Sequence, residues 1–420
     1  MSTRTALPQL QVTRAIAARL AVLVLAALCF AFAAAPSAFA DAAGQRWVAQ
    51  FWPVAQKAGI SRSVYMNALG NFTPDPDVLA KASNQAEFVK PLWDYLDSAV
   101  SEKRLENGKT ALKQYGRQLA AIEAAYGVDR SVVVAIWGME SSYGAVLQNE
   151  KIVKGTIRSL ATLAYQGGSR AKYGRTQLIA ALKILQRGDI GVRGMTGSWA
   201  GAMGHTQFIP TTYQAYAVDF DGDGRRDIWN SEVDALASTA NYLAKMGWRQ
   251  GETWGYEVVL PRGFDWRLAD SGKTAPLSAW RKLGVTRAAG RTFPNSDEAA
   301  RLYAPAGANG PAFLLLPNFR VIKRYNNADA YALAVGHLAD RLRGSGAFVG
   351  EWPRGVRPLS SDERAEVQAL LARRGFYDGA VDGKLGAGTR QAIRAYQRNL
   401  GLVADGYAST GLLQQLRSGG

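Results

Sequence analysis

The sequence is poor in metal-binding and redox-active side chains: its 420 residues include one cysteine, Cys29, and two histidines, His205 and His337. A single cysteine excludes an internal disulfide, and a zinc site rich in histidine or cysteine would lack ligands. The segment "MESSYG" is not the G-x-S-x-G elbow of serine hydrolases, and the glycine-rich loop at 198–210 lacks a lysine in Walker spacing. We therefore expect no organic cofactor and a fold stabilised by its core.

The first forty residues have the order of a secretory signal. Arg14 and Arg19 precede the apolar run "LAVLVLAALCFAFAAA", and small residues at 38–40 precede Asp41. We expect cleavage after residue 40 and a soluble or wall-associated periplasmic protein without a membrane span. An uncleaved anchor is the alternative, although the run is short for a span. Lipidation is disfavoured because Cys29 lies inside this run.

The charge is strongly basic. Cleavage at the expected site removes three arginines and no acid, so the formal net charge falls from +16 to +13. A basic surface suits nucleic acid, an anionic membrane or an anionic wall polymer, and export argues against nucleic acid. Charge that only keeps the protein soluble remains an equal alternative.

The length predicts more than one domain. Helical periodicity runs from residue 41 to about 246, β-favouring segments separated by glycine and proline follow to about 321, and another helix comes after them. Residues 344–357 have the composition of a linker. Residues 358–417 repeat a G-x-D-G-type turn, each copy joined to a helical segment, which indicates a small helical module.

Glu140 is the first candidate for chemistry. It ends a helix expected over residues 129–142, with Asp129 as the cap and Gly144 as the stop, whose centre "VVVAIWGM" is apolar on every face. The helix C-terminus and apolar surroundings both disfavour the ionised carboxylate, so its pKa should rise, as a general acid requires. A glutamate that ends a helix facing water is the alternative.

The loop "SWAGAMGHTQFIP" at 198–210 combines small residues with polar side chains. Small residues let the backbone approach a ligand, and Ser198, His205, Thr206 and Gln207 offer hydrogen bonds.

The segment "DFDGDGRRDIWNSEVD" resembles a calcium-binding EF-hand loop. Asp219, Asp221, Asp223, the Arg225 carbonyl and Asp227 stand at positions 1, 3, 5, 7 and 9. Asn230 replaces the glutamate of position 12, and Asp234 could serve instead in a longer loop. We predict structural Ca²⁺ here, against the alternative of an aspartate-rich surface turn.

Four blocks together resemble the membrane-bound lytic transglycosylase B family of bacterial wall enzymes over residues 41–343. They are "GMESSYG", "SWAGAMGHTQFIPTTYQAYAVDFDGDGRRDIW", "ANYLAKMGW" and "NFRVIKRYNNADAYALAVGHLADRL". The resemblance implies a mainly α, lysozyme-like (α+β) catalytic domain with a small β-containing insertion. The tail "DGAVDGKLGAGTRQAIRAYQ" with "GLVADG" resembles a three-helix peptidoglycan-binding domain; a generic helical cap is the alternative.

The family resemblance implies cleavage of the β-1,4 bond between MurNAc and GlcNAc by one glutamate, Glu140, acting first as acid and then as base. The product is a 1,6-anhydro-MurNAc end, made without water. It further implies that Asp219, Asp221, Asp223, Arg225 and Asp234 bind calcium, and that the substrate is contacted by Ser198, Gln207, Tyr242, Tyr325, Asn326, Tyr331 and Tyr95. Each tyrosine could instead be a half-buried core aromatic.

A retaining hydrolase needs two carboxylates, and only Glu140 is found near the glycine-rich loop outside the calcium-like segment. A lysozyme-type hydrolase and a catalytically silent peptidoglycan-binding scaffold remain the alternatives. We expect glycan strands as the partner and a monomeric protein.

Overall fold

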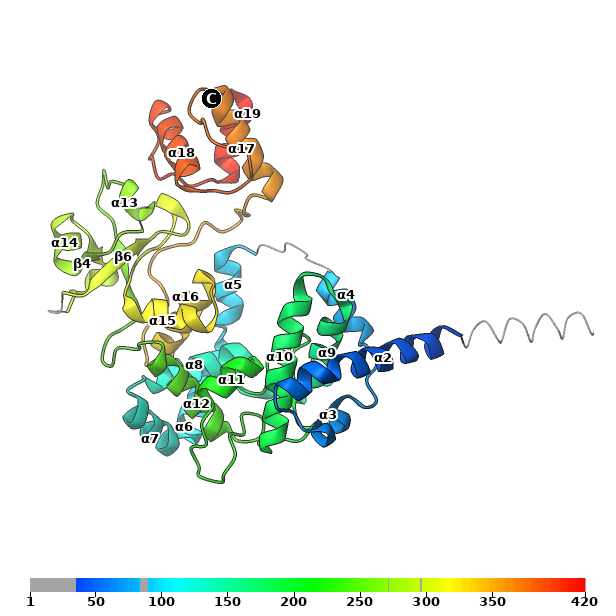
Figure 1. The fold of residues 1–420 in the computed structure, drawn as a ribbon. Coiled ribbons are helices and arrows are strands. Elements are labelled where there is room, and N and C mark those ends of the chain that lie inside the picture. Colours follow the sequence, from blue (N-terminus) through cyan, green and yellow to red (C-terminus); the bar gives the residue numbers. More distant parts are fainter. Residues whose placement is uncertain (1–34, 84–89, 271, 295–296, 420) are drawn as a thin grey trace, which may run out of the picture. The chain divides into compact units, whose positions relative to one another are not determined.

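The computed structural model describes residues 35–83, 90–270, 272–294 and 297–419 (Figure 1). Most of the expected signal sequence lies outside these ranges. The chain divides into two compact units, one of residues 1–85, 151–202 and 209–211, the other of residues 86–150, 203–208 and 212–420. Within the described ranges, no helix has the length and apolarity needed to cross a membrane.

The first unit is helical. Gly174 lets the helices at 156–166 and 168–187 approach closely, because a Cβ at this position would lie 2.6 Å from the Ala164 nitrogen. A two-residue antiparallel ladder joins β1 to β2. The elements are α2 (Ala35–Lys57), α3 (Arg62–Leu69), α4 (Pro76–Ser83), β1 (Lys154–Gly155), α9 (Thr156–Gln166), α10 (Gly168–Arg187) and β2 (Thr196–Gly197).

The second unit is built around a buried helix, α8. Residues 131–138 are buried on all sides, as their uniform apolarity predicts, because α6, α7, α12 and α16 pack around them. The helical elements of this part are α5 (Leu92–Ala99), α6 (Glu102–Gln114), α7 (Gly116–Tyr126), α8 (Arg130–Ser141), η1 (Ala145–Gln148), α12 (Glu232–Lys245), α15 (Pro317–Tyr325) and α16 (Asp329–Leu342). The helix α11 (Pro210–Tyr216) begins in the first unit and ends in the second.

The expected β-containing insertion is an antiparallel five-stranded sheet in the order β4-β6-β7-β3-β5. Its separate core includes Leu277, Trp280, Leu302 and Leu314. The elements are β3 (Gly255–Val259), α13 (Arg267–Asp270), β4 (Ala275–Pro276), α14 (Leu277–Lys282), β5 (Thr286–Arg287), η2 (Ala288–Gly290), β6 (Ala299–Tyr303), η3 (Gly307–Asn309) and β7 (Ala312–Leu315).

The C-terminal module has the three expected helices, α17 (Ser361–Arg373), α18 (Ala387–Asn399) and α19 (Thr410–Ser418) (Figure 1). Its internal repeat has a structural basis. The Gln368 amide of α17 accepts from the Gly383 nitrogen at 2.8 Å and donates to Asp382 at 3.1 Å. The Gln397 amide of α18 bonds Gly406 and Asp405 in the same way, at 2.8 and 2.7 Å. Each D-G turn is therefore fastened to a helix by a buried glutamine.

Residues 344–357 form neither helix nor strand, yet they are held in place. The Glu257 carboxylate of β3 accepts backbone hydrogen bonds from Val349 at 2.8 Å and Gly350 at 2.6 Å. Farther along, Arg354 forms a bidentate ion pair with Asp97 of α5. The segment that the composition marks as a linker is thus tied down at two points.

Candidate active site

Glu140 lies in the last turn of α8. The helix begins as predicted, because Asp129 accepts a hydrogen bond from the Ser131 nitrogen at 2.7 Å. The predicted stop at Gly144 is wrong: Ser142 is the C-cap, in the left-handed region at φ 50°, and its N–H donates to the Trp137 carbonyl. Ser142, held by this backbone hydrogen bond, therefore takes the left-handed C-cap position that we expected a glycine to occupy.

The environment of Glu140 favours its protonated form. Burial raises the pKa of this carboxyl from 4.5 to about 7, against a hydrogen bond from Tyr331 that lowers it. Of the described residues, no second carboxylate contributes to the shift. Glu140 can therefore exist as an acid near neutral pH and, once deprotonated, act as a base.

Three tyrosines interact with this carboxyl, one of them through a hydrogen bond. The Tyr331 hydroxyl of α16 donates to Glu140 Oε1 at 2.6 Å. The Glu140 charge also adds to burial in raising the pKa of Tyr331, Tyr325 and Tyr95. Tyr331 therefore contacts the candidate acid, Tyr325 and Tyr95 lie within reach of its charge, and all three keep their protons at neutral pH.

Tyr242 belongs to an aromatic cluster beside them. Its ring centroid lies 5.1 Å from that of Tyr325, and Phe208 lies 5.7 Å from each. Both hydroxyls bind backbone carbonyls: that of Tyr242 donates to Arg324 at 2.5 Å, and that of Tyr325 to Thr206 at 2.7 Å. The cluster fixes the end of α15 against residues 203–208.

Backbone strain is concentrated in the same region. Among the described residues, the non-glycine residues with positive φ are Ser142, Tyr143, Gln207 and Ala289. Ser142 and Tyr143 come two and three residues after Glu140, and Gln207 lies in the glycine-rich loop with its amide donating to the Gly204 carbonyl at 2.9 Å. Such strain clusters where function demands an unusual geometry.

For two predicted residues the described hydrogen bonds are local. Ser198 belongs to the first unit, where its hydroxyl accepts from the Ala202 nitrogen at 3.1 Å and shapes a tight turn. Asn326 is exposed immediately after α15, and its carbonyl accepts from the Ala328 nitrogen at 2.8 Å. Their roles toward a substrate remain predictions.

The sequence did not point to a buried contact between Trp137 and His205. The indole Nε1 donates to His205 Nδ1 at 3.0 Å. A tryptophan three residues before the candidate acid and a histidine in the glycine-rich loop were the available signals, but their pairing depends on the fold.

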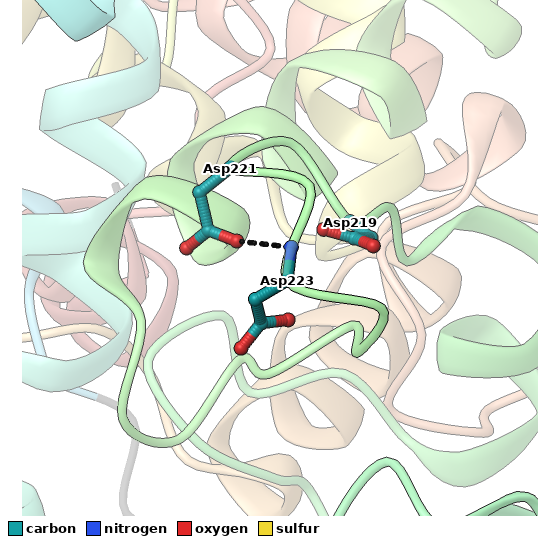
Figure 2. Close-up of side chains that lie close together, drawn as sticks. All are labelled: Asp219, Asp221 and Asp223. Carbon is teal, nitrogen blue, oxygen red and sulfur yellow. Dashed lines mark hydrogen bonds between the residues drawn. The ribbon is translucent and has the colours of Figure 1, made fainter.

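The aspartate-rich loop gathers three carboxylates (Figure 2). Asp219, Asp221 and Asp223 each offer one oxygen within 4.8 Å of the others. The Asp219 carboxylate accepts the Gly222 and Gly224 nitrogens, both at 2.8 Å, so the loop wraps around it. An all-oxygen donor set with converging negative charge fits a hard divalent cation such as Ca²⁺.

The other predicted ligands differ in placement. Asp234 is fully buried and lies outside this three-residue group; its oxygens accept from the Phe220 nitrogen at 2.8 Å and the Asp227 nitrogen at 2.9 Å. The Arg225 nitrogen donates to Asp223 at 2.8 Å. Asp234 therefore shapes the loop from inside, and direct ligation by Asp234 or the Arg225 carbonyl remains a prediction.

Comparison with known proteins connects these features. Residues 43–340 match the model of the transglycosylase SLT domain. The chain belongs to this family. Residues 360–416 match the putative peptidoglycan binding domain. The lytic transglycosylase is 32% identical to membrane-bound lytic murein transglycosylase B of Escherichia coli over 301 residues, which cover 68% of this chain and 79% of the relative.

Solved structures agree with this assignment. SltB3 from Pseudomonas aeruginosa, in complex with NAG-anhNAM-pentapeptide, is 52% identical and superposes with a TM-score of 0.81 over 89% of this chain and 98% of its own. The Escherichia coli lytic transglycosylase Slt35, in complex with calcium, is 28% identical, with a TM-score of 0.58 over 72% and 92% of the two chains. The transglycosylase is an enzyme that acts on peptidoglycan, with the lysozyme-like fold the sequence predicted.

Proposed function

We propose that this lytic transglycosylase cleaves the β-1,4 bond between MurNAc and GlcNAc without water and leaves a 1,6-anhydro-MurNAc end. The observation that carries the proposal is Glu140, a half-buried carboxyl whose pKa is raised to about 7 with no second carboxylate among the described residues contributing. One group at that pKa can donate and regain a proton at neutral pH.

In the first step, protonated Glu140 donates to the glycosidic oxygen as the bond between that oxygen and C1 of MurNAc breaks. Tyr331 donates to Oε1, so the transferable proton is on Oε2. The same hydrogen bond stabilises the carboxylate that forms, because a donor to the charged form lowers its free energy.

In the second step, the Glu140 carboxylate accepts the proton of the C6 hydroxyl of the same MurNAc as O6 bonds to C1. The carboxyl ends protonated, as it began, and no water is consumed. A retaining hydrolase would need a second carboxylate about 5 Å from the acid. The described surroundings of Glu140 instead offer tyrosines, which favours ring closure by the substrate over a hydrolase.

Three further roles belong to this proposal. The tyrosines around Glu140, together with Ser198, Gln207 and Asn326, bind the glycan, while the aspartate-rich loop holds a structural Ca²⁺. The C-terminal module binds the polymer and raises the local substrate concentration. The protein works in the periplasm as an exported monomer; the relatives' action on murein supports this location.

Product analysis tests the reaction. Purified peptidoglycan is digested with wild-type protein and Glu140→Gln, and the fragments are weighed by mass spectrometry. We expect wild-type fragments one water lighter than hydrolysis products, and a loss of at least about 10³-fold in the variant, because glutamine cannot transfer the proton.

Glu106→Gln, at an exposed glutamate of α6, is the matched control and should keep full activity. Reducing MurNAc ends would establish a hydrolase instead. A wild-type protein that binds peptidoglycan without cutting it would establish the scaffold.

A further inference from the structure

We propose that His205 is a positioning residue for the reaction: it holds the C-terminal turn of α8, and with it Glu140, through a buried hydrogen bond to Trp137. The inference rests on the proposed role of Glu140. His205 acts through the indole and is not a catalytic residue, because its described contacts are with Trp137 and backbone.

The imidazole is fixed on several sides. His205 is 6% exposed, and its Nδ1 accepts from Trp137 Nε1 at 3.0 Å, with the two rings edge to face at 5.6 Å. The His205 backbone nitrogen donates to the Ile228 carbonyl at 2.9 Å. An Nδ1 that accepts a hydrogen bond places the imidazole proton on Nε2 and requires a neutral ring.

Trp137 carries the restraint to the acid. It lies three residues before Glu140 on the same helix, and residues with this spacing are neighbours on the helix surface. Its carbonyl also accepts from Ser141 Oγ at 3.3 Å and from the nitrogens of Ser142 and Tyr143. Trp137 is therefore bonded through both its side chain and its backbone to the turn that contains Glu140.

The imidazole also fills the space beside this turn. A Cβ on Gly144 would lie 2.4 Å from His205 Cε1, closer than any side chain allows. The carbonyl of Thr206, the next residue in the chain, accepts from the Tyr325 hydroxyl at 2.7 Å. His205 and Thr206 are thus bonded to α8 and to α15, the two helices that contain Glu140 and Tyr325.

Burial favours the neutral ring and outweighs the charges nearby. Burial lowers the pKa of His205, while the charges of Glu232 and Asp227 act in the opposite direction. Protonation of Nδ1 would remove the acceptor that Trp137 uses. Burial therefore favours the protonation state in which Nδ1 can accept this hydrogen bond.

Acceptor deletion and replacement test the proposal. His205→Leu still fills the space but has no hydrogen-bond acceptor, whereas His205→Asn presents an amide oxygen near the position of Nδ1. We expect the leucine variant to lose about 10-fold or more in kcat with little change in KM, because a misplaced acid slows chemistry more than binding. The asparagine variant should recover most of the loss, and glycan binding should persist in both.

Trp137→Phe removes the donor from the other side and provides a second approach if His205→Leu does not fold. It should slow kcat to a similar extent, and the double variant should be no slower than either single one. Wild-type kcat in His205→Leu or in Trp137→Phe would overturn the proposal, as would additive losses or equal losses in the leucine and asparagine variants. Glu140→Gln with full activity would instead overturn the proposed function.

Discussion

At the scale of single residues, two opposing effects act on the ionised form of one carboxyl, that of Glu140. Burial disfavours the charged form of Glu140, and the Tyr331 hydroxyl favours it. Burial is the larger effect, so the pKa is raised to about 7. The balance between the two determines the pH at which the acid loses its proton.

Removal of the Tyr331 hydroxyl should shift this balance. Tyr331→Phe deletes the hydrogen bond that lowers the Glu140 pKa, so the fall in kcat/KM above about pH 7 should move to higher pH by about half a unit to one unit. The measurement is a pH profile on purified peptidoglycan. Tyr377→Phe, in the C-terminal module, is the control and should leave the profile in place; a shift to lower pH would contradict the assigned hydrogen bond.

Glu140 should also make stability depend on pH. Its pKa is about 7 when folded against 4.5 for the ordinary side chain, so the folded chain binds more protons between these values. The free energy of unfolding therefore falls as pH rises through this range. We expect Glu140→Gln to match wild type near pH 4 and to exceed it by about 1–3 kcal/mol near pH 8.

Denaturant unfolding at both pH values measures this difference. Equal stabilities of the two proteins near pH 8 would mean that the carboxylate is not disfavoured by its surroundings.

At the scale of elements, local sequence predicts a helix better than it predicts where the helix ends or what it meets. The apolar run of α8 determines its burial because every face must avoid water. Its end at Ser142 depends on bonds to the Trp137 carbonyl, and glycine at 144 was a misleading signal. The insertion was recognisable as β from short apolar segments, but its strand order arises from pairing between distant residues.

The aspartate-rich loop before α12 predicts that calcium stabilises the folded protein. Three carboxylates within 4.8 Å repel one another, and Ca²⁺ would remove that cost while binding only the folded chain. Calcium should raise the melting temperature by a few degrees over chelator-treated protein. Asp221→Asn should abolish most of the rise, whereas Asp378→Asn, an exposed aspartate of the C-terminal module, should retain it. An identical melt with and without calcium would mean that the loop is only a turn.

At the scale of the whole molecule, the segment between α16 and the C-terminal module is more ordered than its composition suggests. Glycine, proline and arginine at 344–357 favour a flexible tether. The structure instead fastens it through Glu257, whose carboxylate accepts two backbone hydrogen bonds, and through the pair of Arg354 with Asp97. The connection to the module should therefore resist proteases.

Limited trypsin digestion checks this expectation, because Arg354, which is followed by Gly355, is a cleavage site within the segment, whereas the Arg357–Pro358 bond resists trypsin. Glu257→Gln keeps the shape but weakens the charge-assisted bonds, so cleavage there should become several-fold faster. Glu102→Gln, a highly exposed glutamate of α6, should digest like wild type. Rapid cleavage of wild type after Arg354 would show that the segment is loose despite its contacts.

The sequence by itself determined which residues carry the candidate chemistry. It singled out one glutamate at the end of an apolar helix, an aspartate loop with cation-binding spacing and a repeated D-G turn, because burial and ligand spacing are written locally. Only the tertiary structure decided that Tyr331 donates to Glu140, that Asp234 supports its loop from within, and that His205 meets Trp137. These contacts join residues 14 to 191 positions apart, and no local pattern encodes which distant side chains the packed core will bring together.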